Sequence, residues 1–286
     1  HPPVATLILA ALSLVAFVVF QLDDREEARA AREYYFDSGL AAIELPAYRH
    51  WLTSQGRGEE IDWFGEDTPY DPRRRLYHVQ RRDAAFQQAL KNGEVIDEDH
   101  DAYWDWRDKR RAFEQRMADY TVDAWGLKPN RLDWPNLVTH QFLHGGIAHL
   151  FVNMIMLAAF GSGVERLLGG RRLLIMYLVS GLAGAAAHYL AYPEGTLPVV
   201  GASGAISGLF GAILRLMAKN PAVTGGFVRI LPVVFIWIAI AVITGFTGMP
   251  GAGEAQVAWA AHIGGFLLTL IFFDLFAIGA WPRRVR

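Results

Sequence analysis

The sequence predicts an all-α polytopic membrane protein, a bundle of six transmembrane helices with a large extramembrane insert between the first and second spans. Hydrophobic residues make up 52% of the 286 residues and the mean hydropathy is +0.18, which is too apolar for an ordinary soluble domain of this length. Crossing a hydrocarbon core takes about 20 apolar residues in a helix. Six stretches meet or approach this requirement: 3–21, 148–168, 171–192, 203–218, 230–248 and 256–280.

Composition also excludes some classes of function. The net charge of −2 gives the chain no general attraction to nucleic acid, so no nucleic-acid partner is expected. Because the chain has no cysteine, it has no disulfide, no thiolate metal site and no cysteine nucleophile. Any catalysis must use other side chains, and the lipid bilayer is the partner that the composition implies.

Basic residues in the short loops indicate how the spans are oriented, because lysine and arginine concentrate on the cytoplasmic side. They lie where the second stretch meets the third, where the fourth meets the fifth, and after the sixth: Arg171, Arg172, Arg215, Lys219, Arg229, Arg283, Arg284 and Arg286. The alternate connections, 193–202 and 249–255, contain no lysine or arginine and are expected on the outer side. Ser203, His262 and the start of the second span then share the outer half of the membrane.

The segment between the first two spans is predicted to be a folded helical insert on the outer side. The predicted domains are a first transmembrane helix at 1–22, the insert at 23–132, and a core at 133–286 with five further spans. Charge controls topology only in loops of up to about 60 residues, so the many charges of this segment do not oppose the placement. Polar stretches at 77–92 and 103–120 predict helices. The aromatic residues of the insert either seat it on lipid headgroups or form its own core.

Ser203 is a candidate nucleophile because of its place at the start of an apolar stretch, in Gly201-Ala202-Ser203-Gly204. The small neighbours leave room for a substrate backbone. The first amides of a helix have no intrahelical partner, so the Ser203 amide is free to point at an oxyanion. Serine is also common in packed membrane helices, and Gly204-xxx-Gly208 is typical of close helix contact. The serine alone leaves both interpretations open.

His262 is the candidate general base. It lies a few residues into the last stretch, where an ionisable side chain is costly and therefore indicates function. The alternative is a neutral histidine that is hydrogen-bonded in the core, but a serine at similar depth favours the base. Asp274 lies twelve residues farther on, about 18 Å along a helix and beyond hydrogen-bond reach. A Ser203–His262 dyad is therefore simpler than a triad, with Glu254 in the outer loop left as an open third member.

A group of histidines leads into the second span. His149 and Asn153 are four residues apart, so on a helix they share a face and can both donate toward one point, as an oxyanion hole requires. The rival is a metal site with His140, His144 and His149 as ligands. No HExxH glutamate lies between the first two, and a metal site would leave Ser203 and His262 unexplained, so no metal is predicted.

Together these motifs resemble those of the rhomboid family of intramembrane serine proteases. The resemblance covers about 1–22 and 131–286 and rests on His144-x4-His149-x3-Asn153, Gly201-Ala202-Ser203-Gly204 and Ala261-His262-x2-Gly265. It implies that Ser203 is the nucleophile and His262 the general base. It also implies an oxyanion hole made by His149, Asn153 and the Ser203 amide, with His144, Gly201, Gly204 and Gly265 in supporting roles. Glu165-Arg166, followed by Gly169, resembles the family's Glu-Arg element, the alternative being an interfacial ion pair.

The resemblance further implies a cofactor-free endopeptidase that cleaves peptide bonds in or near transmembrane segments of membrane proteins. Its expected location is the bacterial inner membrane, with the active site toward the periplasmic or outer side. By analogy, the loop 249–257 and the fifth span, with Trp237 and Phe246, form a candidate gate. The oligomeric state does not follow from the sequence.

Three departures from the family pattern stand out. Trp134-Pro135 stands where bacterial relatives often have Trp-Arg, and Thr269 replaces the second glycine of a GxxxG pattern in the last span. Ser207 stands where some relatives pack an aromatic ring against the histidine, so His262 must be oriented by other contacts. The alternative function is a non-catalytic rhomboid-like protein that binds or escorts membrane helices. A third class is a metal-dependent protease or metal transporter built on the histidine group.

Overall fold

The computed structural model describes residues 2–64, 71–219, 231–247 and 258–279, and within these ranges all side chains except those of 63–64 and 240–247. The chain divides into two compact units. One, here called the bundle, contains His1–Gln21, Trp125–Pro193 and Pro198–Arg286. The other, here called the insert, contains Leu22–Ala124 and Glu194–Leu197. The domain boundaries predicted from the sequence stay a prediction.

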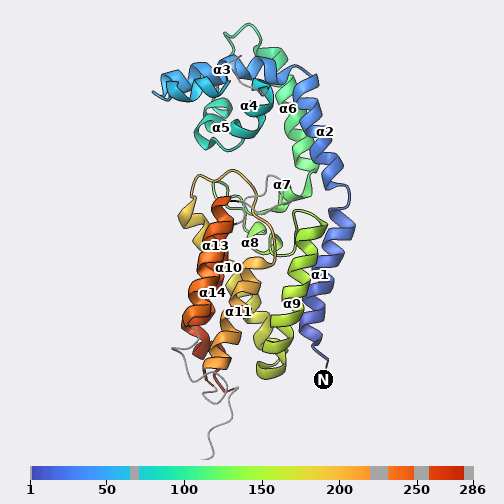
Figure 1. Cartoon of the computed structure of the whole chain (residues 1–286). Coiled ribbons are helices and arrows are strands. Elements are labelled where there is room, and N and C mark those ends of the chain that lie inside the picture. The colour runs from blue at the N-terminus through green and yellow to red at the C-terminus, as the bar shows by residue number, and fades with distance from the viewer. Residues whose placement is uncertain (1, 65–70, 220–230, 248–257, 280–286) are drawn as a thin grey trace, which may run out of the picture. The chain divides into compact units, whose positions relative to one another are not determined.

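The bundle is built of helices (Figure 1). They are α1 (Val4–Phe20), α8 (Asn136–Thr139), α9 (Ile147–Leu168), α10 (Gly170–Ala191), α11 (Ser203–Ala218), α13 (Leu231–Thr247) and α14 (Trp259–Phe276). In the described part of the chain, α9, α10 and α14 are long and apolar enough to cross a membrane, and a fourth candidate begins with α1. The helix α11 is apolar but shorter.

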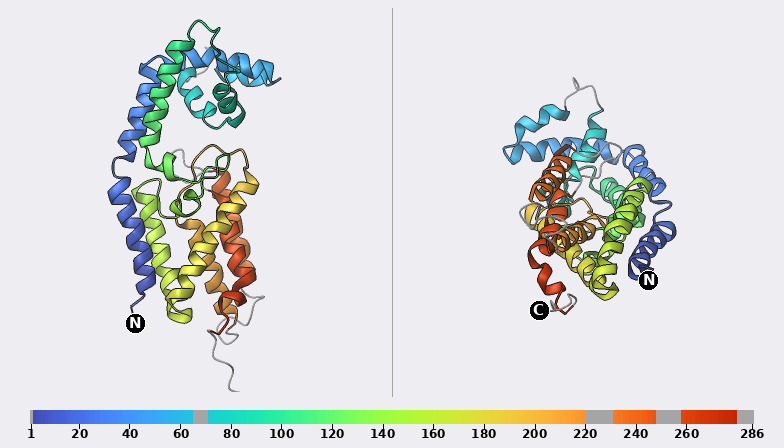
Figure 2. Two further views of the ribbon diagram at one scale, coloured as in Figure 1. Left: turned by 180° about the vertical axis from the view of Figure 1, so that it is seen from behind. Right: turned by 60° about the horizontal axis from the view of Figure 1, so that its bottom comes forward.

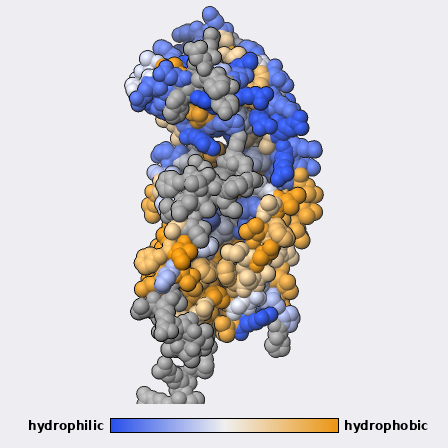
Figure 3. Space-filling model, viewed as in Figure 1, coloured by the Kyte–Doolittle hydropathy of each residue, from blue (hydrophilic) through white to orange (hydrophobic). Residues whose placement is uncertain are grey.

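The surface of the bundle is strongly hydrophobic (Figure 3). Large apolar side chains of α1 such as Leu12 and Phe20 are exposed, as are Phe151 on α9 and Leu275 on α14. A protein in water rarely exposes so continuous an apolar surface, whereas a lipid-facing surface requires one. The surface of the bundle is therefore suited to hydrocarbon.

The closest helix packing in the bundle joins α14 to α10 and α11, which Figures 1 and 2 show side by side. Glycines make this approach possible. A methyl group at Gly184 on α10 would lie 2.7 Å from the Ala261 carbonyl oxygen of α14, and one at Gly265 would collide with the Gly204 carbonyl oxygen of α11. Without side chains at these points, the backbones of the three helices come into direct contact.

The Glu165 carboxylate caps the N-terminus of α1. It accepts hydrogen bonds of 2.8 Å from the amides of Ala5 and Thr6 and from the Thr6 hydroxyl. A carboxylate at a helix N-terminus satisfies amides that lack intrahelical partners and is favoured by the helix dipole. Glu165 thus links α9 to α1. The sequence had suggested a Glu-Arg element or an interfacial ion pair, and neither predicts this capping contact.

The insert is helical in its described residues. Its elements are α2 (Asp24–Asp37), α3 (Leu40–Ser54), the 3-10 helix η1 (Gly58–Phe64), α4 (Pro72–Gln80), α5 (Ala84–Lys91) and α6 (Tyr103–Asp119), with α7 (Thr121–Trp125) at its end. The polar stretch predicted at 77–92 is two helices, α4 and α5. The chain breaks between them because Asp83 accepts from the Phe86 amide and so begins α5 as its N-cap.

The aromatic residues of the insert mainly form its own core, which decides between the two alternatives that the sequence left open. Tyr35, Tyr48, Trp51 and Trp106 are buried there together with Phe86. Trp104, by contrast, is exposed. The surface of the insert is largely hydrophilic, as Figure 3 shows.

A buried ion pair lies inside this core. The fully buried Glu44 carboxylate accepts from the Tyr35 hydroxyl at 2.7 Å, from Trp106 Nε1 at 3.0 Å and from Arg110 Nη1 at 3.1 Å. Arg110 also donates to Glu114 at 2.9 Å. Burial opposes the charged guanidinium, but the Glu44 and Glu114 carboxylates raise the pKa of Arg110 above its usual value, so it stays charged.

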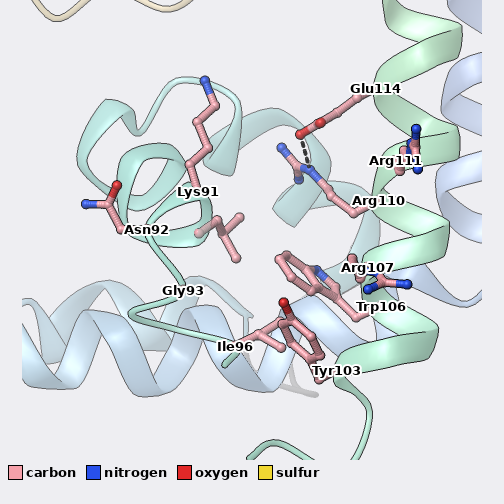
Figure 4. Close-up of a pocket in the computed structure, with 11 residues that line it drawn as sticks. Lys91, Asn92, Gly93, Ile96, Tyr103, Trp106, Arg107, Arg110, Arg111 and Glu114 are labelled. Atoms are coloured by element: carbon pink, nitrogen blue, oxygen red, sulfur yellow. Dashed lines mark hydrogen bonds and ion pairs between the residues drawn. The ribbon is translucent and has the colours of Figure 1, made fainter. Parts of the chain in front are cut away.

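A pocket of about 430 Å³ lies beside this ion pair, between the end of α5 and one face of α6 (Figure 4). Arg110 and Glu114 point toward each other at its polar end, and Tyr103, Trp106 and Ile96 form its apolar end. Arg110 therefore both pairs with Glu44 in the core of the insert and lines the pocket.

Replacing Arg110 with methionine should destabilise the insert by about 3–5 kcal/mol, because it leaves the buried Glu44 carboxylate without its cation. Hydrogen exchange of the α3 and α6 amides in the full chain measures the change. Arg107→Met is the matched control on the same helix. The Arg107 pair with Asp108 is exposed, so its loss should change stability by no more than about 0.5 kcal/mol. Equal effects of the two substitutions would contradict a structural role for the buried pair.

Candidate active site

Ser203 is the first residue of α11, and its side chain meets His262 on α14. Ser203 Oγ and His262 Nε2 lie 2.7 Å apart. This is hydrogen-bond distance, at which the hydroxyl donates when the imidazole is neutral and carries its proton on Nδ1. The pair thus has the geometry of a nucleophile and its base.

Gly201 makes room for the site. Its φ of +129° is a conformation that other residues rarely adopt. A methyl group there would lie 2.9 Å from His149 Nε2 and 3.6 Å from Ser203 Oγ, so the histidine and the serine face the same side of this glycine. The Gly201 amide donates to the His140 carbonyl at 2.8 Å, which fixes the turn that leads into α11.

His149, in the first turn of α9, presents one defined ring nitrogen to this space. The Gly145 amide donates to His149 Nδ1 at 3.3 Å, so a neutral ring carries its proton on Nε2. Nε2 lies beside Gly201, 2.9 Å from the position that a methyl group there would take, and as a protonated nitrogen it acts as a donor. Asn153 is buried, and its Nδ2 donates to the His149 carbonyl at 2.9 Å. Among the described contacts, none joins Asn153 directly to Ser203.

His140 and His144 are buried in the segment between α8 and α9. Burial lowers the pKa of His140 to about 4 and that of His144 to about 3, so both rings are neutral near pH 7. His140 Nδ1 lies 2.7 Å from the Asn136 carbonyl oxygen, and the His144 ring packs edge-on against His149 with centroids 5.2 Å apart. In the residues that the structure describes, no three histidine or carboxylate side chains converge as metal ligands would.

No carboxylate in the described residues hydrogen-bonds to His262. Asp274, on the same helix, instead accepts from Arg215 at 2.9 Å and from Lys219. Glu254 and the loop 249–257 lie outside the described residues. The arrangement in the described part of the chain is therefore a pair without a third acidic member.

Helix packing and a hydrogen bond between two aromatic residues hold the start of α14, the helix that carries His262. The Ser207 hydroxyl donates back to the Ser203 carbonyl at 2.7 Å and does not serve His262. Trp259, at the start of α14, donates through Nε1 to the Tyr192 hydroxyl at 2.8 Å, next to the end of α10. The glycine contacts of α14 with α10 and α11 begin within one turn of His262.

Thr269 strengthens the same interface. It is fully buried, and its hydroxyl donates to the Gly208 carbonyl of α11. Threonine in place of glycine thus adds an interhelical hydrogen bond.

Trp237 of the candidate gate lies on α13. The centroid of its ring lies 5.0 Å from that of Phe210 on α11 and 6.3 Å from that of Phe266 on α14. Phe246, the other gate residue, lies outside the residues whose side chains the structure describes.

Sequence reasoning missed Tyr192, Trp259 and Gln21, whose side chain hydrogen-bonds to the His144 backbone. Aromatic residues at span ends are typical of a membrane interface, so Tyr192 and Trp259 carried no specific signal. A glutamine after an apolar stretch gives no hint of a partner 123 residues away.

Apolar helices and a serine–histidine pair inside their bundle define a multi-pass integral membrane protein with a candidate serine site. The Rhomboid domain matches residues 131–277, more than half of the chain. The protein therefore belongs to the rhomboid family.

Several curated proteins with rhomboid names are similar to this chain. The chain is 36% identical over 151 residues to Rhomboid protease GluP of Bacillus subtilis, and the aligned region covers 51% of this chain and 28% of that protein. It is 32% identical over 155 residues to the putative rhomboid protease YdcA of the same organism, covering 53% of this chain and 73% of that protein. It is also 29% identical over 145 residues to the Arabidopsis thaliana protein called Inactive RHOMBOID-like protein 8, covering 50% of this chain and 38% of that protein.

Replacing Gly201 with alanine should slow labelling of Ser203 by a fluorophosphonate probe about 10²-fold, because the methyl group displaces the His149 ring or the serine turn. Gly169→Ala is the matched control. Gly169 also has a positive φ, +88°, but a methyl group there meets open space. Its labelling rate should stay near that of the wild type. If both variants lose reactivity equally, backbone strain and not the collision is the cause.

Proposed function

We propose that this protein is an intramembrane serine endopeptidase that hydrolyses peptide bonds in or near transmembrane segments of membrane proteins. The observation that carries the proposal is the 2.7 Å contact between Ser203 Oγ and His262 Nε2 inside an apolar bundle. Membership of a family that includes relatives named as proteases supports it.

In the proposed reaction, Ser203 Oγ attacks the carbonyl carbon of the scissile peptide bond while His262 Nε2 takes the hydroxyl proton. The tetrahedral oxyanion accepts hydrogen bonds from His149 Nε2 and the Ser203 amide, with Asn153 as a further donor. The intermediate collapses to an acyl-enzyme ester, and His262 gives its proton to the leaving amine. His262 then takes a proton from a water molecule that attacks the ester carbonyl carbon. The bond from that carbon to Ser203 Oγ breaks, His262 gives the proton to Oγ, and the acyl product leaves as a carboxylic acid.

The proposed topology has six spans: α1, α9, α10, α11, α13 and α14. The length of α11 supports a site below the outer surface. With 16 residues it is only about 24 Å long, shorter than the hydrocarbon thickness of about 30 Å. If Arg215 and Lys219 mark the cytoplasmic interface, Ser203 lies within the membrane. The active site then faces the outer, periplasmic side of a bacterial inner membrane, as does the helical insert at 23–132.

The proposed substrate route passes α13. Trp237 contacts aromatic rings of α11 and α14, so displacing α13 would open the bundle beside the helix that begins with Ser203. Trp237 is the described member of this gate, with Phe246 proposed as the second.

The alternative function is that of a non-catalytic rhomboid-like protein that binds or escorts membrane helices. One similar plant protein is called inactive. The contact between Ser203 and His262 favours the enzyme.

Ser203→Ala and His262→Ala should each abolish cleavage of a reporter transmembrane substrate by the purified protein, because nucleophile and base act as one unit. Ser207→Ala is the matched control, since its hydroxyl lies one turn along α11 and donates to a backbone carbonyl. It should retain most of the activity. Cleavage that persists in the Ser203→Ala protein would contradict the dyad. Loss of cleavage when the wild type is treated with a metal chelator would also contradict it. Absence of fluorophosphonate labelling in the wild type would favour the binding protein.

His149→Ala should lower kcat by about 10²–10³, the usual effect of removing one oxyanion donor, and should leave KM nearly unchanged. The reason is that Nε2 of His149 stabilises charge that appears only in the transition state. Steady-state kinetics with the reporter substrate measure the two constants separately. A rise in KM alone would assign His149 to substrate binding instead.

A further inference from the structure

The side chain of Gln21 forms a two-point clasp on the backbone of His144. Gln21 ends α1 and is only 3% exposed. Its Nε2 donates to the His144 carbonyl at 2.8 Å, and its Oε1 accepts from the His144 amide at 3.0 Å. Both backbone hydrogen-bonding groups of one residue are thus satisfied by a single side-chain amide.

This clasp adjoins the amide that defines the protonation of His149. Gly145 follows His144 directly, and its amide donates to His149 Nδ1 at 3.3 Å. If that amide moved away, Nδ1 could carry the proton instead, and Nε2 would present a lone pair to the reacting site. A lone pair there repels an oxyanion instead of stabilising it.

Two glycines follow the residue that the clasp holds. Gly145 and Gly146 stand between His144 and α9, and two glycines in succession are costly to order. Neither ring nitrogen of the buried His144 has a hydrogen-bond partner in the described part of the chain. At His144 the hydrogen bonds therefore come from the backbone clasp, while the ring contributes packing against His149.

We propose that Gln21 is a positioning residue that keeps the proton of His149 on Nε2, the nitrogen that lies beside Gly201. It acts through the His144 backbone and the Gly145 amide and does not touch substrate. The effect of Gln21 on catalysis rests on the proposed function, whereas its effect on the tautomer of His149 does not.

The primary test is Gln21→Met, which keeps the volume of the side chain and removes both hydrogen bonds. We expect kcat to fall about 10–10²-fold at unchanged KM, the scale of a misplaced catalytic group. In a His149→Ala background the same substitution should cause no further loss, because the group through which it acts is absent. Thr6→Val is the control at the other end of α1, where it removes a hydrogen bond to Glu165, and should leave kcat near that of the wild type.

A second readout is independent of activity. In ¹⁵N-histidine NMR spectra, with His149 assigned by its loss in His149→Ala, the wild type should show protonated Nε2. Gln21→Met should move the signal toward the Nδ1-protonated form or a mixture. An unchanged His149 signal would overturn the proposal, as would an equal loss of kcat with and without His149. If Ser203→Ala still cleaves, the proposed function fails, and the NMR result still decides the role of Gln21.

Gln21→Glu provides a rescue. A protonated carboxyl group can donate to the His144 carbonyl and accept from its amide as glutamine does, whereas a carboxylate cannot donate. Such a carboxyl group becomes protonated as the pH falls. The kcat of Gln21→Glu relative to the wild type should therefore rise toward low pH. A ratio that does not depend on pH would contradict the clasp.

Discussion

The structure of the bundle depends on how closely α14 approaches α10 and α11. Lipid gives no hydrophobic driving force between helices, so packing and interhelical hydrogen bonds must hold them together. Gly184, Gly204 and Gly265 allow direct backbone contact, and Thr269 adds a buried hydrogen bond to the Gly208 carbonyl. At this separation His262 reaches Ser203 at 2.7 Å. A wider spacing would break that contact, because both residues lie on helix backbones and neither is carried by an adaptable loop.

The bundle residues on either side of Leu22–Ala124 are hydrogen-bonded to segments that lead to the candidate site. Gln21, directly before the insert, holds His144. Leu127, just after it, exchanges two backbone hydrogen bonds with Val199, of 3.0 and 2.8 Å. Val199 lies two residues before Gly201, whose own amide is held by the His140 carbonyl. The chain on both sides of Leu22–Ala124 is thus anchored to segments that carry or precede residues of the candidate site.

Sequence alone could predict the helical membrane class, because long runs of apolar residues are rare outside membrane-spanning helices, and the family, because several motifs occur together. It could also single out Ser203 and His262, since polar groups in apolar helices are rare and costly. It could not predict how the start of α14 is held, because the Tyr192–Trp259 hydrogen bond joins residues 67 apart. Nor could it find the break at Asp83 inside 77–92, where a local cap outweighed a continuous polar helical pattern.

In the described residues, the Ser203–His262 pair has no carboxylate as a third member, and this affects the proposed mechanism. In a triad, the third residue both orients the histidine and stabilises the imidazolium that forms. Here helix packing supplies the orientation, but no carboxylate in the described part of the chain supplies the charge. The positive imidazolium and the negative oxyanion must then stabilise each other across a medium of low dielectric, where such attraction is strong. The oxyanion therefore has to be held in one place, which makes the orientation of the His149 ring as important to the reaction as the identity of the base.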